Sequence, residues 1–210
     1  MDLNKLLTVV IPCKNELKTI DTTLTLLNFQ NNINNVNVII SDSSTDETTY
    51  QLESRTKDKF SLKIIQGGLP AKARNNGAMY VKTPYVLFLD SDMYLLDPTL
   101  LTTITTTMLK EDIDLLTTKI RTTNGKYNHV FKTFDFIQKM SKFISPFCLG
   151  GFMLFKIDTF YKLGGFDEEA KVAEDYLLSK QIKPNRFKIL NTRSEEHTSE
   201  LQSPYVISYA

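Results

Sequence analysis

Residues 85–92 read YVLFLDSD, an apolar run that ends in two aspartates separated by a serine. A short apolar run bounded by polar residues predicts a buried strand, here Tyr85–Leu89. Two carboxylates one residue apart, Asp90 and Asp92, can hold a hard divalent cation, which prefers oxygen ligands. A lone pair of this kind is also typical of a solvated turn. Its position directly after a buried strand in an α/β pattern favours the metal site.

The residues before this strand alternate between predicted strands and predicted helices. Apolar runs indicate strands at 6–11, 36–40 and 62–65, and helical spacing of apolar residues indicates helices at 16–29, 48–57 and 72–81. This alternation predicts an α/β fold with a mostly parallel, Rossmann-like sheet and helices on both faces. Ligands of such sheets bind at the carboxyl ends of the strands, so a nucleotide-type ligand is expected there.

The second half of the chain changes character. Residues 127–147 are aromatic-rich near helical spacing and carry lysines on the polar side. This pattern predicts either a helix packed on the sheet or a basic amphipathic helix on a membrane surface. Gly150 and Gly151 then interrupt the chain before a further apolar run, FMLF at 152–155.

Composition narrows the class of protein. With 210 residues, 41% of them hydrophobic, the chain is long enough for one globular domain, and a net charge of +1 argues against a nucleic-acid binder. The two cysteines, Cys13 and Cys148, form no metal-spaced cluster and fit a reduced compartment. We find no signal peptide and no apolar run of the ~20 residues that a spanning helix needs. A cytoplasmic location is expected, with contact at the inner face of a membrane left open.

The segment 193–210, RSEEHTSELQSPYVISYA, resembles translated sequencing-adapter sequence along its whole length. Such segments do not belong in fold reasoning. We therefore expect residues 1–192 to form the native folded domain, residues 193–210 to be a non-native tail, and the natural C-terminus to be missing. His197 lies in this tail and is given no role.

Three further clusters carry polar groups suited to a ligand. Asp42, with Ser44 and Asp46, follows the second predicted strand, where a carboxylate can accept hydrogen bonds from a base or ribose. Helix capping by Ser44 or Asp46 is the alternative. Lys72 and Arg74, with amides at 75 and 76, stand at a helix start and suit a diphosphate or a base edge, or else an ordinary surface helix.

The third cluster is GGFDE at 164–168, followed by Glu174 and Asp175. The first segment predicts a tight turn, and Asp175 opens a predicted helix. A carboxylate at a helix N-terminus is favoured electrostatically and stays ionised, so it could serve as a general base. Simple capping by the acidic pair is the alternative.

Taken in chain order, these segments resemble glycosyltransferase family 2 over roughly residues 6–182. The matching motifs are VVIPCKNE at 9–16, SDSSTDET at 41–48, ARNNGA at 73–78, DSD at 90–92, and GGFDE with AED at 164–168 and 173–175. Ser41 stands where the family commonly has an aspartate, which leaves the base specificity open.

The resemblance implies that residues 1–192 are a catalytic domain with a GT-A fold. The implied reaction is an inverting transfer of a sugar from a nucleotide-diphosphate sugar to an acceptor hydroxyl. A UDP-sugar is the favoured donor, and the hydroxyl belongs to a sugar or a lipid-linked acceptor. Cell-surface polysaccharide or glycolipid synthesis is the implied setting. By the same resemblance Asp175 is the catalytic base, and Asp90 and Asp92 bind Mg²⁺ or Mn²⁺. The implied substrate-binding residues are Pro12, Asp42, Lys72, Arg74, Asp90, Gly150, Gly151 and Glu174.

Two other functions are less consistent with the sequence. A nucleotidyltransferase would carry a glycine-rich phosphate loop after the first strand, where this chain has PCKNE. A non-catalytic nucleotide-sugar-binding module would be expected to lack Asp92 or Asp175, and both are present. An inactive fragment of an active enzyme remains an alternative.

Overall fold

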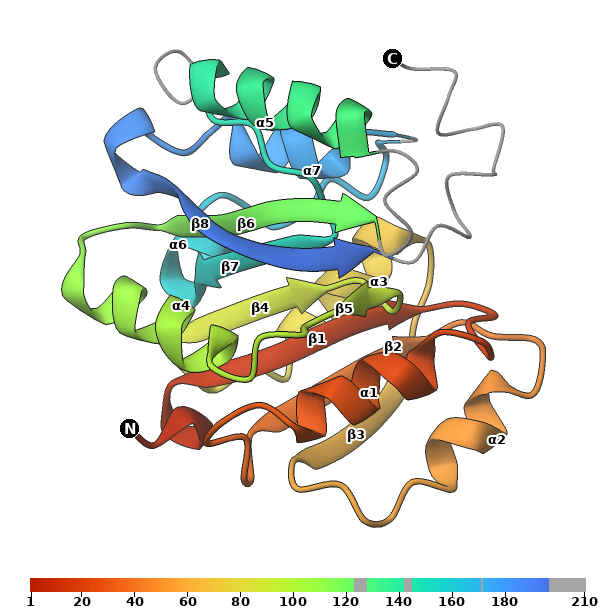
Figure 1. The fold of residues 1–210 in the computed structure, drawn as a ribbon. Helices are drawn as coiled ribbons and strands as arrows, with labels where there is room; N and C mark the ends of the chain where they lie inside the picture. The colour runs from red at the N-terminus through yellow and green to blue at the C-terminus, as the bar shows by residue number, and fades with distance from the viewer. Residues whose placement is uncertain (123–127, 142–144, 171, 197–210) are drawn as a thin grey trace.

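The computed structural model describes residues 1–122, 128–141, 145–170 and 172–196 (Figure 1). Its strands are β1 (Leu7–Cys13), β2 (Asn37–Asp42), β3 (Ser61–Gln66), β4 (Tyr85–Leu89), β5 (Met93–Tyr94), β6 (Leu115–Thr122), β7 (Phe152–Lys156) and β8 (Phe187–Glu196). Its helices are α1 (Ile20–Asn28), α2 (Thr48–Glu53), α3 (Pro70–Ala78), α4 (Leu100–Lys110), α5 (Asn128–Ser141), α6 (Ile157–Lys162) and α7 (Glu174–Ser179), with 3-10 turns η1 (Leu3–Lys5) and η2 (Pro184–Arg186). Within the described ranges the strands form one sheet in the order β3-β2-β1-β4-β7-β6-β8-β5.

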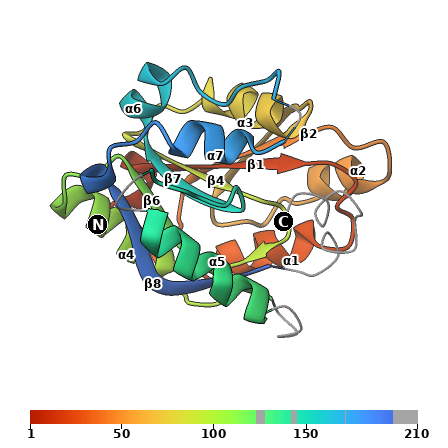
Figure 2. The same ribbon diagram turned by 90° about the horizontal axis from the view of Figure 1, so that it is seen from above.

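Helices cover both faces of this sheet, as the sequence predicts. Figure 2 shows α1 and α4 on one side and α3 and α6 on the other. The alternation of side chains along each strand supplies both cores. In β1, Val9 and Ile11 pack in the core that contains residues of α1 and α4, whereas Val10 packs in the core that contains residues of α3 and α6.

Strands β3, β2, β1 and β4 run parallel, which places their carboxyl ends at one edge. Strand β7 runs antiparallel to both β4 and β6, so the sheet is mostly parallel, as expected, but not entirely. Strand–helix alternation implies parallel strands only where each connection crosses back to the starting edge. Because β7 is antiparallel to β4, its first residue, Phe152, lies beside Leu89 at the end of β4.

All three helices predicted before β4 differ from their expected bounds. Helix α2 ends at Glu53 rather than at residue 57, and α3 ends at Ala78 rather than at residue 81. Helix α1 begins at Ile20 rather than at residue 16, because residues 16–19 form a turn in which the Glu16 carbonyl accepts from the backbone N–H of Thr19. Helix α3 begins earlier than predicted, with Pro70 in its first turn, where a missing N–H costs nothing.

Strand β8 continues to Glu196 and pairs with β6 up to Thr122. Four residues of the predicted tail, 193–196, thus share the backbone pairing, which any non-proline residue can make. The origin of residues 193–210 stays a prediction, and 197–210 lie outside the described residues.

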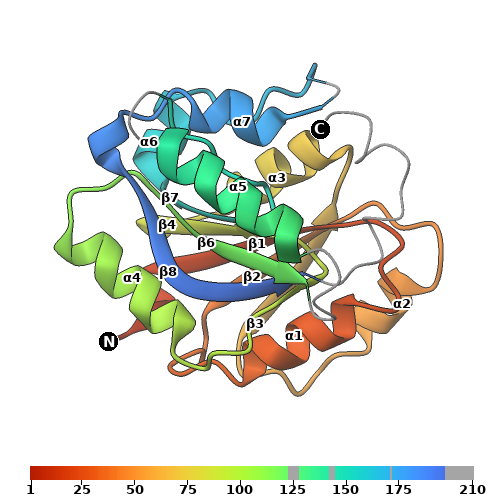
Figure 3. The same ribbon diagram turned by 45° about the horizontal axis from the view of Figure 1, so that its top comes forward.

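Helix α5 lies beside β6 (Figure 3). Its described side chains include an exposed apolar group, Phe136, Ile137 and Met140, next to exposed Lys132 and Lys139. Tyr127 and Ile144, which belong to the predicted apolar spacing, fall outside the described residues. In the part of the chain that the structure describes, no helix has the length and apolar character needed to cross a membrane.

Candidate active site

The predicted donor-binding residues lie at the carboxyl edge of the parallel strands. Cys13 at the end of β1 is paired with Asp42 at the end of β2, and Asp42 with Gln66 at the end of β3. Asp90 follows β4 directly, at the same edge. The register therefore places Asp42 and Asp90 at the same edge of the sheet, on either side of the end of β1.

Arg74 lies at the centre of a buried ion network. Its guanidinium donates through Nη2 to Oδ1 of Asp90 and through Nη1 to Oε1 of Glu174, both at 2.7 Å. The Arg74 residue is only 4% exposed. Burial alone would lower the pKa of Arg74, but the two carboxylates raise it overall, so the guanidinium stays charged. One side chain thus joins the DSD motif after β4 to the acidic pair at the start of α7.

Asp175 lies next to this network, at the first turn of α7. A Cβ built on Gly150 would lie 3.3 Å from both Oδ2 of Asp175 and Nη2 of Arg74, so the glycine leaves room for both groups. Burial, together with the negative charge of Glu174, raises the pKa of Asp175 to about 6. The backbone N–H of Tyr176, which donates to Oδ1 at 2.7 Å, and the Arg74 charge counter the rise. A carboxyl group tuned in this way is suited to proton transfer near neutral pH.

The DSD turn is fixed by backbone contacts. The Asp90 N–H donates to the Gly151 carbonyl at 3.1 Å, and the Thr23 hydroxyl donates to the Ser91 carbonyl at 2.7 Å. Gly151 also packs near Met93, whose sulfur would lie 3.2 Å from an added Cβ. The antiparallel β7 therefore brings Gly151 beside the DSD turn, while Gly150 lies beside Arg74 and Asp175.

The predicted metal ligands are two carboxylates. Asp92 is buried, and Asp90 is partly exposed. Among the described residues, no group of three or more His, Cys, Asp or Glu side chains is placed to hold a metal ion. A site with two carboxylates still fits Mg²⁺ or Mn²⁺ chemically, because oxygen atoms of a bound diphosphate can complete the coordination.

The second group of predicted residues surrounds Asp42 at the end of β2. Its Oδ1 accepts from the backbone N–H and hydroxyl of Ser44, at 3.0 and 2.6 Å, and its Oδ2 accepts from the Thr49 hydroxyl at 2.5 Å. Asp46 accepts from the Thr48 N–H at 3.0 Å, and this side-chain and backbone bonding lowers the Asp46 pKa. Asp46 thus bonds the first residue of α2, although the N-cap position itself is occupied by Glu47, and Asp42 has a structural role in the turn.

Neighbouring backbone ties this turn to the other strand ends. The Gly67 N–H donates to the Asp42 carbonyl at 2.8 Å, and the Ser43 hydroxyl donates to the Gly68 carbonyl at 2.9 Å. Lys72 lies exposed beside Gly68, while Pro12 is paired with Ser41 in the sheet. Pro12, Asp42 and Lys72 therefore belong to the β1–β2–β3 side of the edge.

The amides of the RNNG segment have protein partners, which the sequence did not reveal. Asn75 bridges to the GGFDE loop, accepting from the Phe166 N–H at 3.0 Å and donating to the Phe166 carbonyl at 2.8 Å. Asn76 donates to the Gly67 carbonyl at 3.1 Å. Gly77 packs so closely on Val10 that an added Cβ would overlap its Cγ1. The segment therefore anchors α3 both to the GGFDE loop and to the end of β3, and no local sequence pattern indicates these partners.

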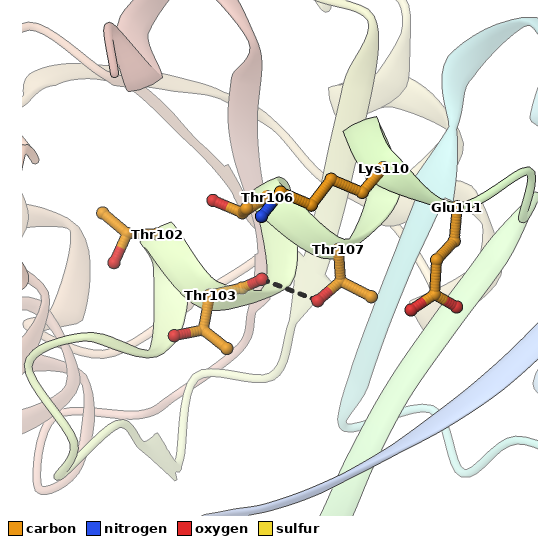
Figure 4. A pocket seen from close by; sticks show the side chains of 6 residues that line it. All are labelled: Thr102, Thr103, Thr106, Thr107, Lys110 and Glu111. Carbon is orange, nitrogen blue, oxygen red and sulfur yellow. Dashed lines mark hydrogen bonds between the residues drawn. The ribbon is translucent and has the colours of Figure 1, made fainter.

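Two surface hollows in the described part of the structure lie away from these residues. One, of about 310 Å³, runs along α4 and is lined by Thr102, Thr103, Thr106, Thr107, Lys110 and Glu111 (Figure 4). The Thr107 hydroxyl there donates to the Thr103 carbonyl of the same helix at 2.9 Å. A second hollow includes Tyr85, the first residue of β4, and so lies at the opposite end of that strand from Asp90. Neither hollow contains a predicted site residue.

A family model for glycosyl transferase family 2 matches residues 8–164. The chain belongs to this family. The match spans the first four predicted motifs and ends at the GGFDE turn, so the resemblance inferred from the motifs is confirmed.

The relatives agree with this membership. The poly(ribitol-phosphate) beta-N-acetylglucosaminyltransferase TarS of Staphylococcus aureus is 28% identical over 184 residues, which cover 81% of this chain and 31% of TarS. The chain therefore spans less than a third of the length of the curated relatives it matches.

Solved structures confirm the GT-A fold. S. aureus TarS 1–349 in complex with UDP-GlcNAc aligns with a TM-score of 0.72 at 23% identity, covering 91% of this chain and 58% of that one. The mannosyltransferase PcManGT from Pyrobaculum calidifontis, in complex with GDP-Man and Mn²⁺, aligns with a TM-score of 0.72 at 18% identity, covering 95% and 58%.

Proposed function

We propose that this chain carries the donor site and the general base of an inverting glycosyltransferase that moves a sugar from a nucleotide-diphosphate sugar to an acceptor hydroxyl. The observation that carries the proposal is the Arg74 network. It joins Asp90 of the DSD motif to Glu174, the immediate neighbour of Asp175. Donor-side and acceptor-side motifs are thereby within one or two side chains of each other, as a single displacement requires.

In this reaction Asp175 takes the proton of the acceptor hydroxyl. The hydroxyl oxygen forms a bond to the anomeric carbon on the face opposite the diphosphate, and the bond from that carbon to the diphosphate oxygen breaks. The nucleoside diphosphate leaves with the electron pair. A pKa of about 6 keeps Asp175 ionised at neutral pH while leaving it basic enough to accept the proton.

The donor is held along the strand edge. Pro12 and Asp42 would contact the nucleoside, with Lys72 and Arg74 supplying positive charge toward the diphosphate. Gly150 and Gly151 would line the sugar pocket, and their small size beside Asp175 and Met93 supports that role. Because Asp42 already accepts hydrogen bonds from Ser44 and Thr49, its orientation is fixed before a nucleotide arrives.

Mg²⁺ or Mn²⁺ would be held by Asp92 and Asp90, and when bound it would stabilise the negative charge of the departing diphosphate. This role agrees with the oxygen-rich character of the pair.

A UDP-sugar is the proposed donor class, supported by the likeness to TarS, which has been solved with UDP-GlcNAc. The acceptor would be a hydroxyl of a cell-surface polymer or a lipid-linked sugar, supported by the name of that relative, a poly(ribitol-phosphate) transferase.

Helix α5 supports peripheral contact with the cytoplasmic face of a membrane. Phe136, Ile137 and Met140 are exposed beside Lys132 and Lys139. Apolar side chains flanked by lysines suit an anionic lipid surface. Cosedimentation with phosphatidylglycerol vesicles would test the contact, and binding that survives Phe136→Ser with Met140→Ser would exclude this face.

The decisive experiment for the reaction compares the unaltered chain with Asp175→Asn. UDP affinity, measured by calorimetry, should be retained, while sugar transfer from the UDP-sugar to the acceptor should fall by at least about 100-fold. Full transfer by the variant would remove Asp175 from the base role.

A further inference from the structure

We infer that Glu174 and Asn75 are positioning residues that fix the segment carrying Asp175 to helix α3, rather than ligands of the donor or acceptor. For Glu174 this replaces the direct substrate contact that the sequence resemblance implies. The inference rests on the proposed role of Asp175 as the base.

The first contact is the Arg74–Glu174 ion pair at the start of α7. The Arg74 side chain is 5% exposed and that of Glu174 is 19% exposed, so the 2.7 Å bond is largely shielded from water. Charged hydrogen bonds in such surroundings are strong and demanding in geometry. Because Glu174 precedes Asp175 by one residue, fixing its carboxylate fixes the first turn of the helix that carries the base.

The second contact, between Asn75 and Phe166, lies nine residues upstream of the base. Besides its two bonds to Phe166, the Asn75 amide donates to Oε1 of Glu168 at 2.9 Å. Gly165 adopts a φ of +76°, and a Cβ there would lie 2.8 Å from Oδ1 of Asn75. A glycine is thus needed both for the backbone conformation and for the approach of the amide. Two consecutive residues of α3 therefore hold both ends of the segment 165–175.

Helix α3 is itself anchored to the sheet. Gly77 lies against Val10 of β1, and Asn76 bonds the carbonyls of Gln66 and Gly67 at 3.3 and 3.1 Å. Close packing on a buried strand leaves little freedom for the helix to shift. Contacts made from α3 consequently set positions relative to the strand edge where the donor is proposed to bind.

The backbone conformation just before α7 indicates that surrounding contacts hold Asp175 in its position. Ala173 has a φ of +59°, a left-handed conformation that is unfavourable for a residue with a Cβ. Strained backbone of this kind persists where surrounding contacts determine it. Here the flanking contacts are those of Glu174 and, further upstream, Phe166. A base displaced by about 1 Å loses on the order of 100-fold in rate, so such contacts matter to catalysis.

The test uses the full chain with Glu174→Ala, Glu174→Gln and Asn75→Ala, and with Gln181→Ala as the matched control. Gln181 is an exposed amide whose Nε2 bonds only within its own helical turn, to the Leu177 carbonyl at 3.1 Å. Three quantities are measured: UDP affinity by calorimetry, the kcat and KM of UDP release from UDP-GlcNAc, and hydrogen–deuterium exchange of the α7 amides.

We expect Glu174→Ala and Asn75→Ala to raise amide exchange in α7 about tenfold. They should lower kcat about 10- to 100-fold while the UDP affinity and the donor KM stay within about threefold. Glu174→Gln keeps an acceptor oxygen for Arg74 and should recover part of the loss, and Gln181→Ala should match the unaltered chain. If the alanine variants do not fold, Glu174→Gln and Asn75→Asp give the same comparison with smaller changes.

Loss of UDP affinity by tenfold or more in Glu174→Ala, with α7 exchange unchanged, would make Glu174 a ligand and overturn the inference. Unchanged exchange and unchanged kcat would overturn it as well. The exchange measurement decides about positioning even if Asp175→Asn retains turnover, in which case the proposed base role fails separately.

Discussion

Arg74 and Glu174 stand 100 residues apart in the chain, yet Nη1 of Arg74 donates a 2.7 Å hydrogen bond to Oε1 of Glu174. The same guanidinium holds Asp90. A single buried cation therefore connects the end of β4 with the helix that carries the proposed base.

The pH dependence of turnover should follow Asp175. Its pKa is raised to about 6, and only the ionised carboxylate can accept a proton. We expect kcat to fall as the pH drops through about 6, rather than near 4 as for an ordinary aspartate. A profile of kcat between pH 4.5 and 8.5 at saturating donor checks this. An acid limb centred near pH 4 would contradict the placement of Asp175 in a desolvated site.

The same raised pKa makes a prediction about folding stability. A carboxyl group whose pKa is higher in the folded than in the unfolded chain contributes stability below the unfolded value of about 4 and loses it as the pH rises through about 6. Asp175→Asn cannot ionise, so its Tm should match that of the unaltered chain near pH 4 and exceed it above pH 7. Thermal unfolding across this range measures the difference, and a constant offset at all pH values would argue against it.

Gly77→Ala should destabilise the domain by about 1–3 kcal/mol, because the new methyl group would overlap Val10 in a fully buried contact. Chemical denaturation gives the free energy of unfolding. In a Val10→Ala background the added methyl has space, so the penalty for Gly77→Ala should shrink or reverse, since alanine favours helix. Equal penalties in both backgrounds would mean that the two residues do not contact.

Both cysteines should resist thiol reagents in the folded protein. Cys13 and Cys148 are buried, and burial raises the pKa of Cys13 to about 12 and that of Cys148 further. Thiolate is the reactive form, so labelling by DTNB at pH 8 should be slow until denaturant is added. Rapid labelling of either cysteine under native conditions would place it nearer the surface than described.

Sequence pattern predicts the parallel half of this fold well. The span of β4 is predicted as it is observed, and the placement of Asp42 and Asp90 at one edge follows from strand periodicity and the rule for parallel sheets. These features depend on local apolar runs, which a single sequence displays directly.

The antiparallel strands and the hydrogen-bond partners of the charged and amide side chains cannot be predicted from local apolar runs. The direction of β7 and the existence of β6 depend on pairing between distant segments. The residue types of Arg74 and Asn75 suggested a ligand site, but their binding to Glu174 and Phe166 follows only once α3 and α7 are placed in space. Hydrogen bonds between residues far apart in the chain produce no periodic pattern in the sequence.

The most direct test of the donor site is thermal unfolding of the full chain with UDP, GDP or CMP, each with and without Mn²⁺, alongside Asp92→Asn. We predict that UDP with Mn²⁺ stabilises the unaltered chain, by about 2.7 kcal/mol at 100 times its Kd, and that this shift is lost in Asp92→Asn. Equal stabilisation with and without Mn²⁺, or a shift that persists in Asp92→Asn, would contradict the proposed metal-assisted donor site.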